Sequence, residues 1–541
     1  MHGSKANSWD EHWLHAVPAA PNPRANAPSE PTEIRGRATS REKSGPHARK
    51  LARFAGPNET GHFIAEQQAH YVWRTSVPSV TRFGSRPWVH PESSESGRVH
   101  LRGPTDGLSR CAEETRPLAR TAYLDGIRGL AALGVVVLHM VLGFFPNSSY
   151  AYNGTPGRDS IFQMPFVRLL YTGQPTIFFL ISGYVLSIGP IKKSRNQAWG
   201  PLHQDLSSKI FRRIFRLYIP SIIATFFPMF MVSFGLFPGV VKFNDEMPHH
   251  EFNMAPREAT FFRQFWLWCK TIPPLFWPFD WENFSQNSPY AYQLWTIAVE
   301  YRCSMILFLL LIGLSRCQSK TRLTINSLFA LYFLALDKWD VFLFVAGAII
   351  AEVDIIREEA AESQLPKSET GESKPVASRQ KSPKWLLVAG VILGLWILSV
   401  PAADIWKSWT FTILETWAPK NYKGIFRFWD AVGTVILIWS ITGLPSIQRF
   451  FTRRIFLYLG NISFSLYLTH TIALKFLLYP IMPWLYTIFG YQTDFQYGLS
   501  FGIGGTLTVL LSFWLADVFQ RHVEEPSARF TSWIDTKCSK G

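Results

Sequence analysis

Apolar blocks of about 20 residues recur through most of this sequence and restrict the folds open to it. A block of that length crosses a bilayer as a helix, because backbone groups inside lipid must satisfy one another's hydrogen bonds. About ten blocks start near these residues: Ile127, Leu169, Ile214, Tyr292, Leu323, Val341, Trp385, Phe426, Phe456 and Tyr497. The sequence therefore predicts an all-α, polytopic membrane protein with about ten transmembrane helices.

The composition changes near residue 120. Residues 1–120 are rich in Pro, Ser, Arg and Glu and lack sustained periodicity, which predicts a disordered, basic cytosolic tail without a signal peptide. Residues 121–526 form the predicted membrane domain, and residues 527–541 a short cytosolic C-terminal tail. The mean hydropathy of +0.05 is an average over these unlike parts.

The distribution of basic residues predicts the topology. Lys and Arg cluster after the second and fourth blocks and before the ninth, and the positive-inside rule assigns these loops to the cytosol. Both termini are then cytosolic if the number of spans is even. Sequons at Asn147, Asn153 and Asn283 fall in loops on the opposite side, which predicts glycosylation there. We expect an integral, multi-pass protein of an endomembrane, either endoplasmic reticulum or Golgi, or of the plasma membrane.

The net charge of +15 raises the question of a polyanionic partner. The cations gather beside membrane spans and in the tail rather than in a nucleic-acid recognition motif. We therefore expect the lipid bilayer and an anionic cosubstrate as partners, and no nucleic acid. The cysteines show no metal-ligand spacing, so we also expect no metal and no tightly bound cofactor.

The first apolar block carries an arginine and a histidine that lipid does not favour. Arg128 and His139 lie 11 residues apart in "YLDGIRGLAALGVVVLHMVLGFF". On an α-helix they share one face to within about 20° and are separated by roughly 16 Å along the axis. Arg128 would lie near the cytosolic entrance and His139 near the middle of the bilayer, facing the bundle interior. The alternative is that Arg128 snorkels to lipid headgroups and His139 is a packing residue.

Two further blocks carry polar stripes at helical spacing. In the fourth, Glu300 belongs to a stripe that we expect to face the interior at a depth similar to His139, so that the two side chains meet if the helices are neighbours. In the ninth, Ser463, Tyr467 and His470 form a second stripe, for which hydrogen bonding between helices is an equal interpretation.

A pair of arginines precedes the third apolar block. Arg213 and Arg216 lie three residues apart in "KIFRRIFRLY", on one face of the helix at its cytosolic mouth. They either set the topology or bind phosphate groups in bidentate fashion.

Five of these motifs, in this order, resemble the membrane acyltransferase-3 family, particularly its fungal-type members. They are "YLDGIRGLAALGVVVLH", "FFLISGYVLS", the arginine pair, "LWTIAVEYRCSM" and "ISFSLYLTH", and the resemblance covers roughly residues 120–526. It implies an enzyme that moves an acyl group, commonly acetyl, from acyl-CoA to a hydroxyl of an acceptor. It implies functional roles for Arg128, His139, Arg213 and Arg216, and matches Glu300 to the acidic residue of the fourth-span motif. The esterase-like domain of some bacterial members does not follow, so the membrane domain would do all the chemistry.

Each residue then has an expected role. Arg213 and Arg216 would hold acyl-CoA, a cytosolic anion, while the thioester reaches inward. His139 would act as general base, oriented by Glu300, or would itself accept the acyl group; His470 could replace it, with Tyr467 nearby.

A proton-coupled transporter is the alternative function, because intramembrane His and Glu also build proton relays. It predicts repeated halves with broken helices, and no clear repeat is present. The acceptor stays open between a carbohydrate, a lipid and a small metabolite, and the aromatic loop at residues 238–289 is the expected specificity element or an interfacial anchor.

Overall fold

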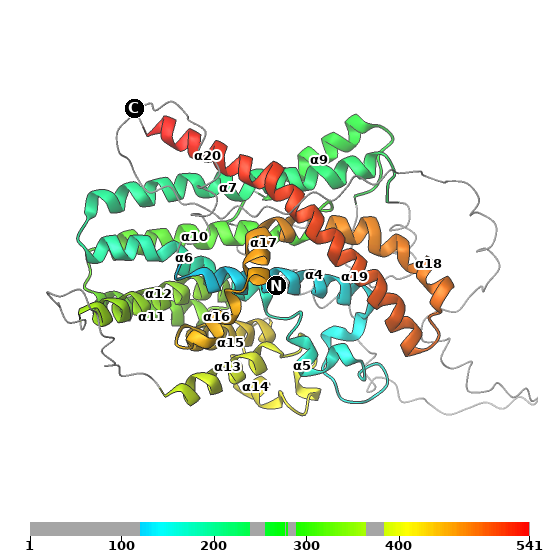
Figure 1. Ribbon diagram of the computed structural model, residues 1–541, viewed down its shortest axis with the longest axis horizontal. Coiled ribbons are helices and arrows are strands. Elements are labelled where there is room, and N and C mark those ends of the chain that lie inside the picture. The colour runs from blue at the N-terminus through cyan, green and yellow to red at the C-terminus, as the bar shows by residue number, and fades with distance from the viewer. Residues whose placement is uncertain are drawn as a thin grey trace, which may run out of the picture. The chain divides into compact units, whose positions relative to one another are not determined.

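A computed structural model describes residues 119–237, 255–275, 277–279, 288–363, 383–422 and 424–539. These residues form helices joined by turns and two isolated β-bridges, with no strand among them, so the all-α prediction is confirmed (Figure 1). The tail predicted for residues 1–120 lies, except for its last two residues, outside the described residues.

Each of the ten predicted spans coincides with a helix. In chain order these are α4 (Ala122–Phe144), α6 (Gln174–Arg195), α7 (Trp199–Ser233), α10 (Trp295–Gly313), α11 (Ser319–Ala335), α12 (Trp339–Ser363), α13 (Lys384–Leu398), α15 (Ile425–Thr442), α17 (Arg454–Ala473) and α19 (Asp494–Phe519). The connecting helices include α5 (Pro165–Arg168), α9 (Phe261–Leu275), α14 (Thr412–Trp417), α16 (Pro445–Phe451) and α18 (Tyr479–Phe489). Short 3₁₀ segments are Pro146–Ser149, Ile161–Gln163, Tyr292–Leu294 and Ile405–Lys407.

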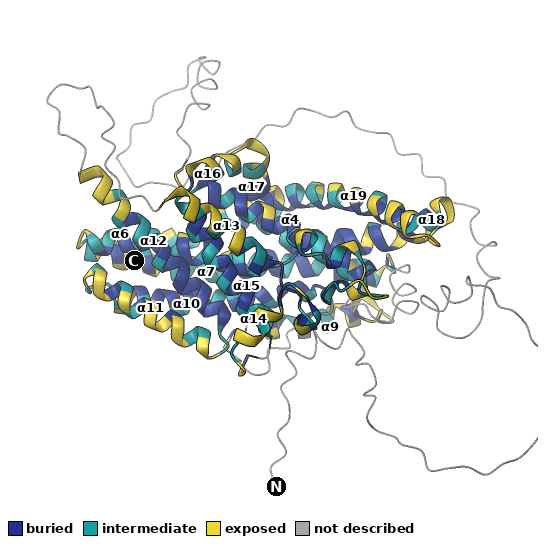
Figure 2. Cartoon of the chain, turned by 90° about the horizontal axis from the view of Figure 1, so that it is seen from below, coloured by how far each residue is buried: buried dark blue, intermediate teal, exposed yellow. Residues whose placement is uncertain are grey.

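Seven helices in the described part of the chain are long and apolar enough to cross a membrane. They are α4, α6, α7, α10, α15, α17 continued by α18, and α19 continued by α20 (Glu525–Cys538). Large apolar side chains are exposed on the outer faces of these and other helices. Leu309 of α10, for example, is 70% exposed. Such faces suit contact with lipid, while Figure 2 shows the buried residues on the inner faces.

The other three predicted spans, α11, α12 and α13, differ from that group in length or charge. Helix α11 has 17 residues and α13 has 15, whereas α12 carries acidic side chains along its length. Those of α12 are buried with partners: Asp340 pairs with Arg302 at 2.6 Å, and Glu352 pairs with Arg322 at 2.5 Å. Pairing of this kind allows a charged helix to lie in an apolar interior.

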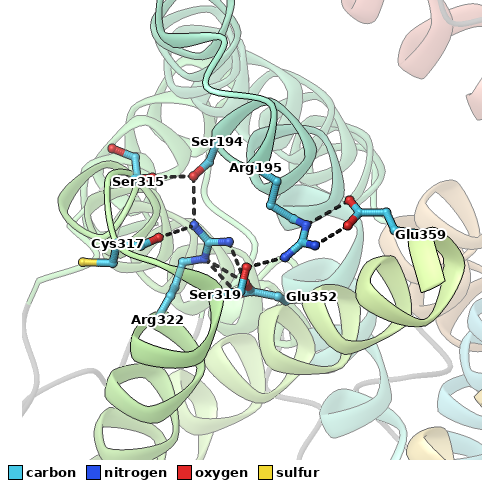
Figure 3. Close-up of polar contacts among 8 residues, drawn as sticks. All are labelled: Ser194, Arg195, Ser315, Cys317, Ser319, Arg322, Glu352 and Glu359. Atoms are coloured by element: carbon cyan, nitrogen blue, oxygen red, sulfur yellow. Dashed lines mark hydrogen bonds and ion pairs between the residues drawn. The ribbon is translucent and has the colours of Figure 1, made fainter. Parts of the chain in front are cut away.

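The Arg322–Glu352 pair belongs to a polar network that joins α6, α11 and α12. Arg322 donates to both carboxylate oxygens of Glu352 and, at 2.8 Å, to Ser194 of α6 (Figure 3). Next to it, Arg195 of α6 pairs with Glu359 of α12, and this second pair is more exposed (Figure 3). The network fixes the ends of these three helices relative to one another.

Glycines allow α4 and α17 to pack closely. A Cβ at Gly129 would lie 2.3 Å from the backbone nitrogen of Gly460, and one at Gly460 would lie 2.4 Å from the carbonyl oxygen of Asp125. No side chain fits at either position, so the two backbones touch. Arg128 of α4 contacts Ser463 of α17, and farther along both helices His139 contacts His470, so the two helices run in the same direction. The first and ninth spans of a chain that crosses the membrane back and forth are expected to be parallel in this way.

Helix α19 continues without a loop into α20 (Figure 1). A π-helical turn, Gln520–Glu524, leads into α20, which packs against α7 through a 2.5 Å hydrogen bond from Ser208 to Asp535. Most of the short tail predicted for residues 527–541 is therefore helical.

Candidate functional site

Two histidines stack at one end of the α4–α17 interface. The rings of His139 and His470 are 5.2 Å apart between centroids, with 19° between their planes. His139 is 5% exposed and His470 is fully buried. The hydroxyl of Tyr292, just before α10, lies 2.5 Å from Nδ1 of His139. Three helices thus supply one buried group of titratable side chains.

The hydrogen bonds of His470 fix its tautomer. Its Nδ1 lies 2.8 Å from the carbonyl oxygen of Tyr467 and 3.2 Å from that of Leu466. A carbonyl oxygen only accepts, so Nδ1 carries the hydrogen and Nε2 carries the lone pair. This Nε2 is buried and has no hydrogen-bond partner among the described residues. His470 is therefore held in the form that accepts a proton.

Hydrogen bonds between α17 and the segment 293–296 show where Glu300 lies relative to the two histidines. Gln293 donates to Thr471 at 3.0 Å, and Thr296 lies 2.5 Å from the hydroxyl of Tyr467, which also donates to the carbonyl of Gln293. Higher residue numbers in α10 thus contact lower residue numbers in α17, so the two helices are antiparallel. By this register Glu300 lies one turn beyond Tyr467, away from the histidines.

Arg128 occupies the other end of the same interface. Its guanidinium donates to Ser463 at 3.1 Å and to the carbonyl of Gly460 at 3.3 Å, and it pairs with Asp125 at 3.1 Å. The predicted stripe of the ninth span therefore faces α4, with Ser463 beside Arg128 and His470 beside His139.

Glu300 contacts an arginine rather than a histidine. Its carboxylate accepts from Arg213 at 2.7 Å and from Ser182 at 3.0 Å, and Arg213 also donates to Ser304 at 3.0 Å. The expected meeting of Glu300 and His139 does not occur, because Tyr292 lies opposite His139 and Glu300 lies about two turns farther along α10. Glu300 and Arg213 nevertheless belong to one site.

Further charges surround this arginine end. Arg216, which is exposed, interacts electrostatically with Arg213 and Arg128 and with Glu524 of the π-helical turn. Glu524 accepts a 2.5 Å hydrogen bond from Ser465. Arg128, Arg213 and Arg216 thus form a cluster, the arginine cluster, whose neighbouring carboxylates are those of Asp125, Glu300 and Glu524.

Two residues of this candidate site, Tyr292 and Glu524, escaped the sequence reasoning. Tyr292 continues the polar stripe of the fourth span by one turn, at the spacing of Thr296 and Glu300, and that spacing was the available signal. Glu524 follows the last predicted span, and nothing in the sequence near it indicated a contact with the site. Its hydrogen bond with Ser465 depends on how the π-helical turn packs against α17.

The predicted glycosylation sites are placed in part. Asn147 is exposed, and the side chain of Asn153 accepts from Thr155 of its own sequon. Asn283 lies outside the described residues, as does half of the aromatic loop at 238–289; the described half comprises α9 and short stretches beside it. No group of three or more potential metal ligands occurs among the residues that the structure describes.

Polar side chains occur at two levels of the α4–α17 interface, Arg128 with Ser463 and His139 with His470, and this series of residues is called the polar path. Cations at one end suit an anion, and a buried proton acceptor at the other suits a reaction that removes a proton from a bound group. The same helices carry both ends.

Comparison with known proteins identifies relatives of this chain. O-acetyltransferase PaAT-1 of Phomopsis amygdali is 29% identical over 460 residues, which cover 80% of this chain and 88% of the relative. Acyltransferase R4 of a Phoma species is 25% identical over 457 residues, covering 76% of this chain and 95% of the relative. Acyltransferase clz18 of Cochliobolus lunatus is 24% identical over 458 residues, covering 76% and 94%. No solved structure matches the chain.

The family comparison agrees with these relatives. The acyltransferase-3 model, described as an acyltransferase domain, matches residues 121–517, which is well over half of the chain and includes all the site residues named above except Glu524. The chain therefore belongs to the membrane acyltransferase-3 family, and it is a membrane acyltransferase.

Proposed function

We propose that this acyltransferase moves an acetyl group from acetyl-CoA to a hydroxyl group of its acceptor, on an endomembrane or the plasma membrane. One observation carries the proposal: the buried pair His139 and His470 and the arginine cluster lie at opposite ends of one helix interface. The printed name of the Phomopsis relative, an O-acetyltransferase, supports the choice of acetyl group and hydroxyl.

The arginine cluster binds the donor. CoA carries several phosphates, and guanidinium groups hold phosphates through paired, charge-assisted hydrogen bonds. Arg216 is exposed, and Arg213 is held in place by Glu300 and Ser304. Glu300 acts in this proposal as a positioning residue for Arg213. The arm of CoA then extends along α4 toward the histidines, a distance of roughly 16 Å.

The histidines provide the base. A hydroxyl of the acceptor loses its proton to an imidazole Nε2 as its oxygen bonds to the thioester carbonyl carbon. The tetrahedral intermediate collapses, the carbon–sulfur bond breaks, and the leaving thiolate takes the proton back from the imidazolium. The products are the acetate ester and free CoA.

The two histidines are not equivalent in this step. His139 acts as base when its Nδ1 hydrogen donates to Tyr292, because Nε2 then carries the lone pair. His470 is held in that form by backbone carbonyls. We assign the base to His139, and His470, stacked on it, to excluding water and accepting the proton if His139 is removed.

The experiment measures free CoA released from acetyl-CoA by purified protein in nanodiscs, with a panel of hydroxylated acceptors. His139→Gln keeps a polar side chain but loses the base, and turnover should fall by roughly a hundredfold to ten-thousandfold. His470→Gln should lower turnover less. The matched control is His522→Gln, because His522 is exposed on the π-helical turn, and its activity should be unchanged.

The donor site is tested separately. Replacing both Arg213 and Arg216 by Ala should raise KM for acetyl-CoA more than KM for the acceptor. The matched control replaces Arg453 and Arg454, which are exposed basic residues at the start of α17. Full activity of His139→Gln would refute the base assignment. Wild-type protein that consumes no acetyl-CoA with any acceptor, but takes up solute in a proton-dependent manner, would favour the transporter.

A further inference from the structure

A cavity distinct from the polar path lies beside it, at the opposite end of the bundle from the arginine cluster. Its volume is about 110 Å³, and it is formed by the end of α4, the start of α6 and the start of α15, with the residues that follow α13. An apolar cavity of similar size, about 150 Å³, holds a benzene ring. The space therefore admits one ring of a small molecule.

The wall of the cavity is mainly apolar and aromatic. The apolar lining includes Leu138, Leu142, Trp295, Trp339 and Phe426. Arg427 lies over the two indole rings, with its guanidinium carbon 5.6 Å from the ring centroid of Trp295 and 5.3 Å from that of Trp339. Ligand pockets typically combine such walls with a few polar groups that fix orientation.

Three side-chain oxygens of residues that line the cavity, Oγ of Ser148, Oε1 of Gln174 and Oδ1 of Asp430, lack hydrogen-bond partners among the described residues. Gln174 is 3% exposed and Asp430 is 8% exposed, and both line the cavity. Oε1 of Gln174 and Oδ1 of Asp430 are buried, with no hydrogen-bond partner among the described residues. Buried polar atoms of this kind are rare, because leaving one unsatisfied costs about 1–3 kcal/mol. Both oxygens accept hydrogen bonds, so the missing partner is a donor.

The charges at the cavity favour an uncharged ligand. Arg168 and Arg427 interact electrostatically with Asp430. Arg168 already donates to the carbonyls of Ser148, Ser399 and Val400, which occupy three of its donor groups. A ligand anion would meet the Asp430 carboxyl, and a ligand cation would meet two guanidinium groups.

The cavity is close to the histidines along α4. Leu138 is adjacent to His139 in sequence, and Leu142 lies about 60° around the helix from it. Trp295, which also lines the cavity, follows Tyr292 by three residues, and Tyr292 contacts His139. A ligand that fills the cavity therefore has one edge near the side of α4 that carries the base.

We propose that this cavity binds the acceptor, and that the acceptor is an uncharged, mainly apolar ring compound carrying at least two hydroxyl groups. One hydroxyl donates a hydrogen bond shared between the oxygens of Asp430 and Gln174, and a second lies toward His139, where it receives the acetyl group. The inference rests on the proposed function. It selects an apolar small molecule over a charged or fully polar carbohydrate.

The first experiment detects occupancy without catalysis. Ala402, which lines the cavity, is replaced by Cys, and alkylation of that cysteine by N-ethylmaleimide is followed by mass spectrometry. A cyclohexanediol, which has a single ring, should protect it, and cyclohexanol and glucose should protect it less. Adding Gln174→Met or Asp430→Leu should raise the half-protecting diol concentration roughly fivefold each, the usual effect of one hydrogen bond. Gln448→Met, in α16 beyond the end of α15, is the matched control and should change nothing.

The second experiment measures CoA release with the same three compounds. The assignment is supported if the wild-type protein releases CoA faster with the diol than with the other two compounds and Gln174→Met does not show this preference. Equal protection by all three compounds, or protection unaffected by both variants, overturns it even if acetyl transfer to another acceptor proceeds. If the diol protects the cysteine but the protein consumes no acetyl-CoA with any acceptor, the binding site is supported and the proposed function is refuted.

Discussion

Adding a single methyl group between α4 and α17 should separate the two stacked histidines, His139 and His470. In Gly129→Ala the new Cβ would lie 2.3 Å from the backbone nitrogen of Gly460, whereas ordinary contacts begin at 3.4 Å. A backbone atom of a packed helix cannot rotate aside, so the helices must move apart by roughly 1 Å. His139 belongs to one of these helices and His470 to the other.

The expected effect is large because the reacting groups must be held within a fraction of an ångström. A displacement of about 1 Å can lower the rate about a hundredfold. We therefore expect kcat for acetyl transfer to fall by about two orders of magnitude in Gly129→Ala. Gly460→Ala should act in the same direction, since its Cβ would lie 2.4 Å from the Asp125 carbonyl oxygen.

The assay is CoA release by purified protein in nanodiscs, normalised to the monodisperse fraction after gel filtration. Gly502→Ala in α19 is the matched control, because nothing lies within 4 Å of its added Cβ. It should keep full activity and gain slightly in thermal stability, since Ala favours a helix over Gly by about 1 kcal/mol. Wild-type kcat in correctly folded Gly129→Ala would refute the claim that close packing of these helices sets the active geometry.

Four further changes test other parts of the structure. Tyr292→Phe should lower kcat up to tenfold and leave both KM values unchanged, because it removes one hydrogen bond to the base. Glu300→Gln should change KM for acetyl-CoA more than kcat if Glu300 positions Arg213, and a fall in kcat alone would restore it as a partner of the base. Arg322→Met should destabilise the protein by about 3–5 kcal/mol in thermal unfolding, because it strands the fully buried Glu352. Burial alone would raise the pKa of Asp404, but hydrogen bonds from Lys407 and Arg158 lower it below its ordinary value of 3.8, so the stability difference between wild type and Asp404→Asn should be complete above that pH and shrink below it.

Helix period was enough to predict some features and insufficient for others. Arg128 and His139 were expected on one face because their spacing is a property of a single helix, and both do face α17. The positions of the ten helices were likewise predicted, because apolar length is a local property. Their neighbours are not local. Glu300 meets Arg213 rather than His139 because the register between α7, α10 and α17 decides the contact, and a single sequence does not contain that register.

The cavity beside α4 was outside the reach of the sequence for a similar reason. Gln174 follows a turn and Asp430 lies in an apolar span more than 250 residues later. Each reads as an isolated polar residue, and only the packing of α4, α6 and α15 brings their unpartnered oxygens to one space. The aromatic loop at 238–289 offered a stronger compositional signal for acceptor recognition, whereas the cavity proposed to bind the acceptor is lined by residues at helix ends.

Helices α4 and α17 each carry residues at both ends of the site, so the distance between the two ends is fixed by the helices themselves. Arg128 and His139 are joined by three turns of α4, and Ser463 and His470 by two turns of the parallel α17. The spacing between the arginine cluster and the base is then set by helical rise, which deforms little, rather than by loop conformation. A long donor anchored by its phosphates would present its thioester at a fixed depth, whatever acceptor occupies the neighbouring cavity. Donor length and acceptor shape would thus be selected by separate parts of the fold, so that the cavity residues can vary between relatives while the path along α4 and α17 stays the same.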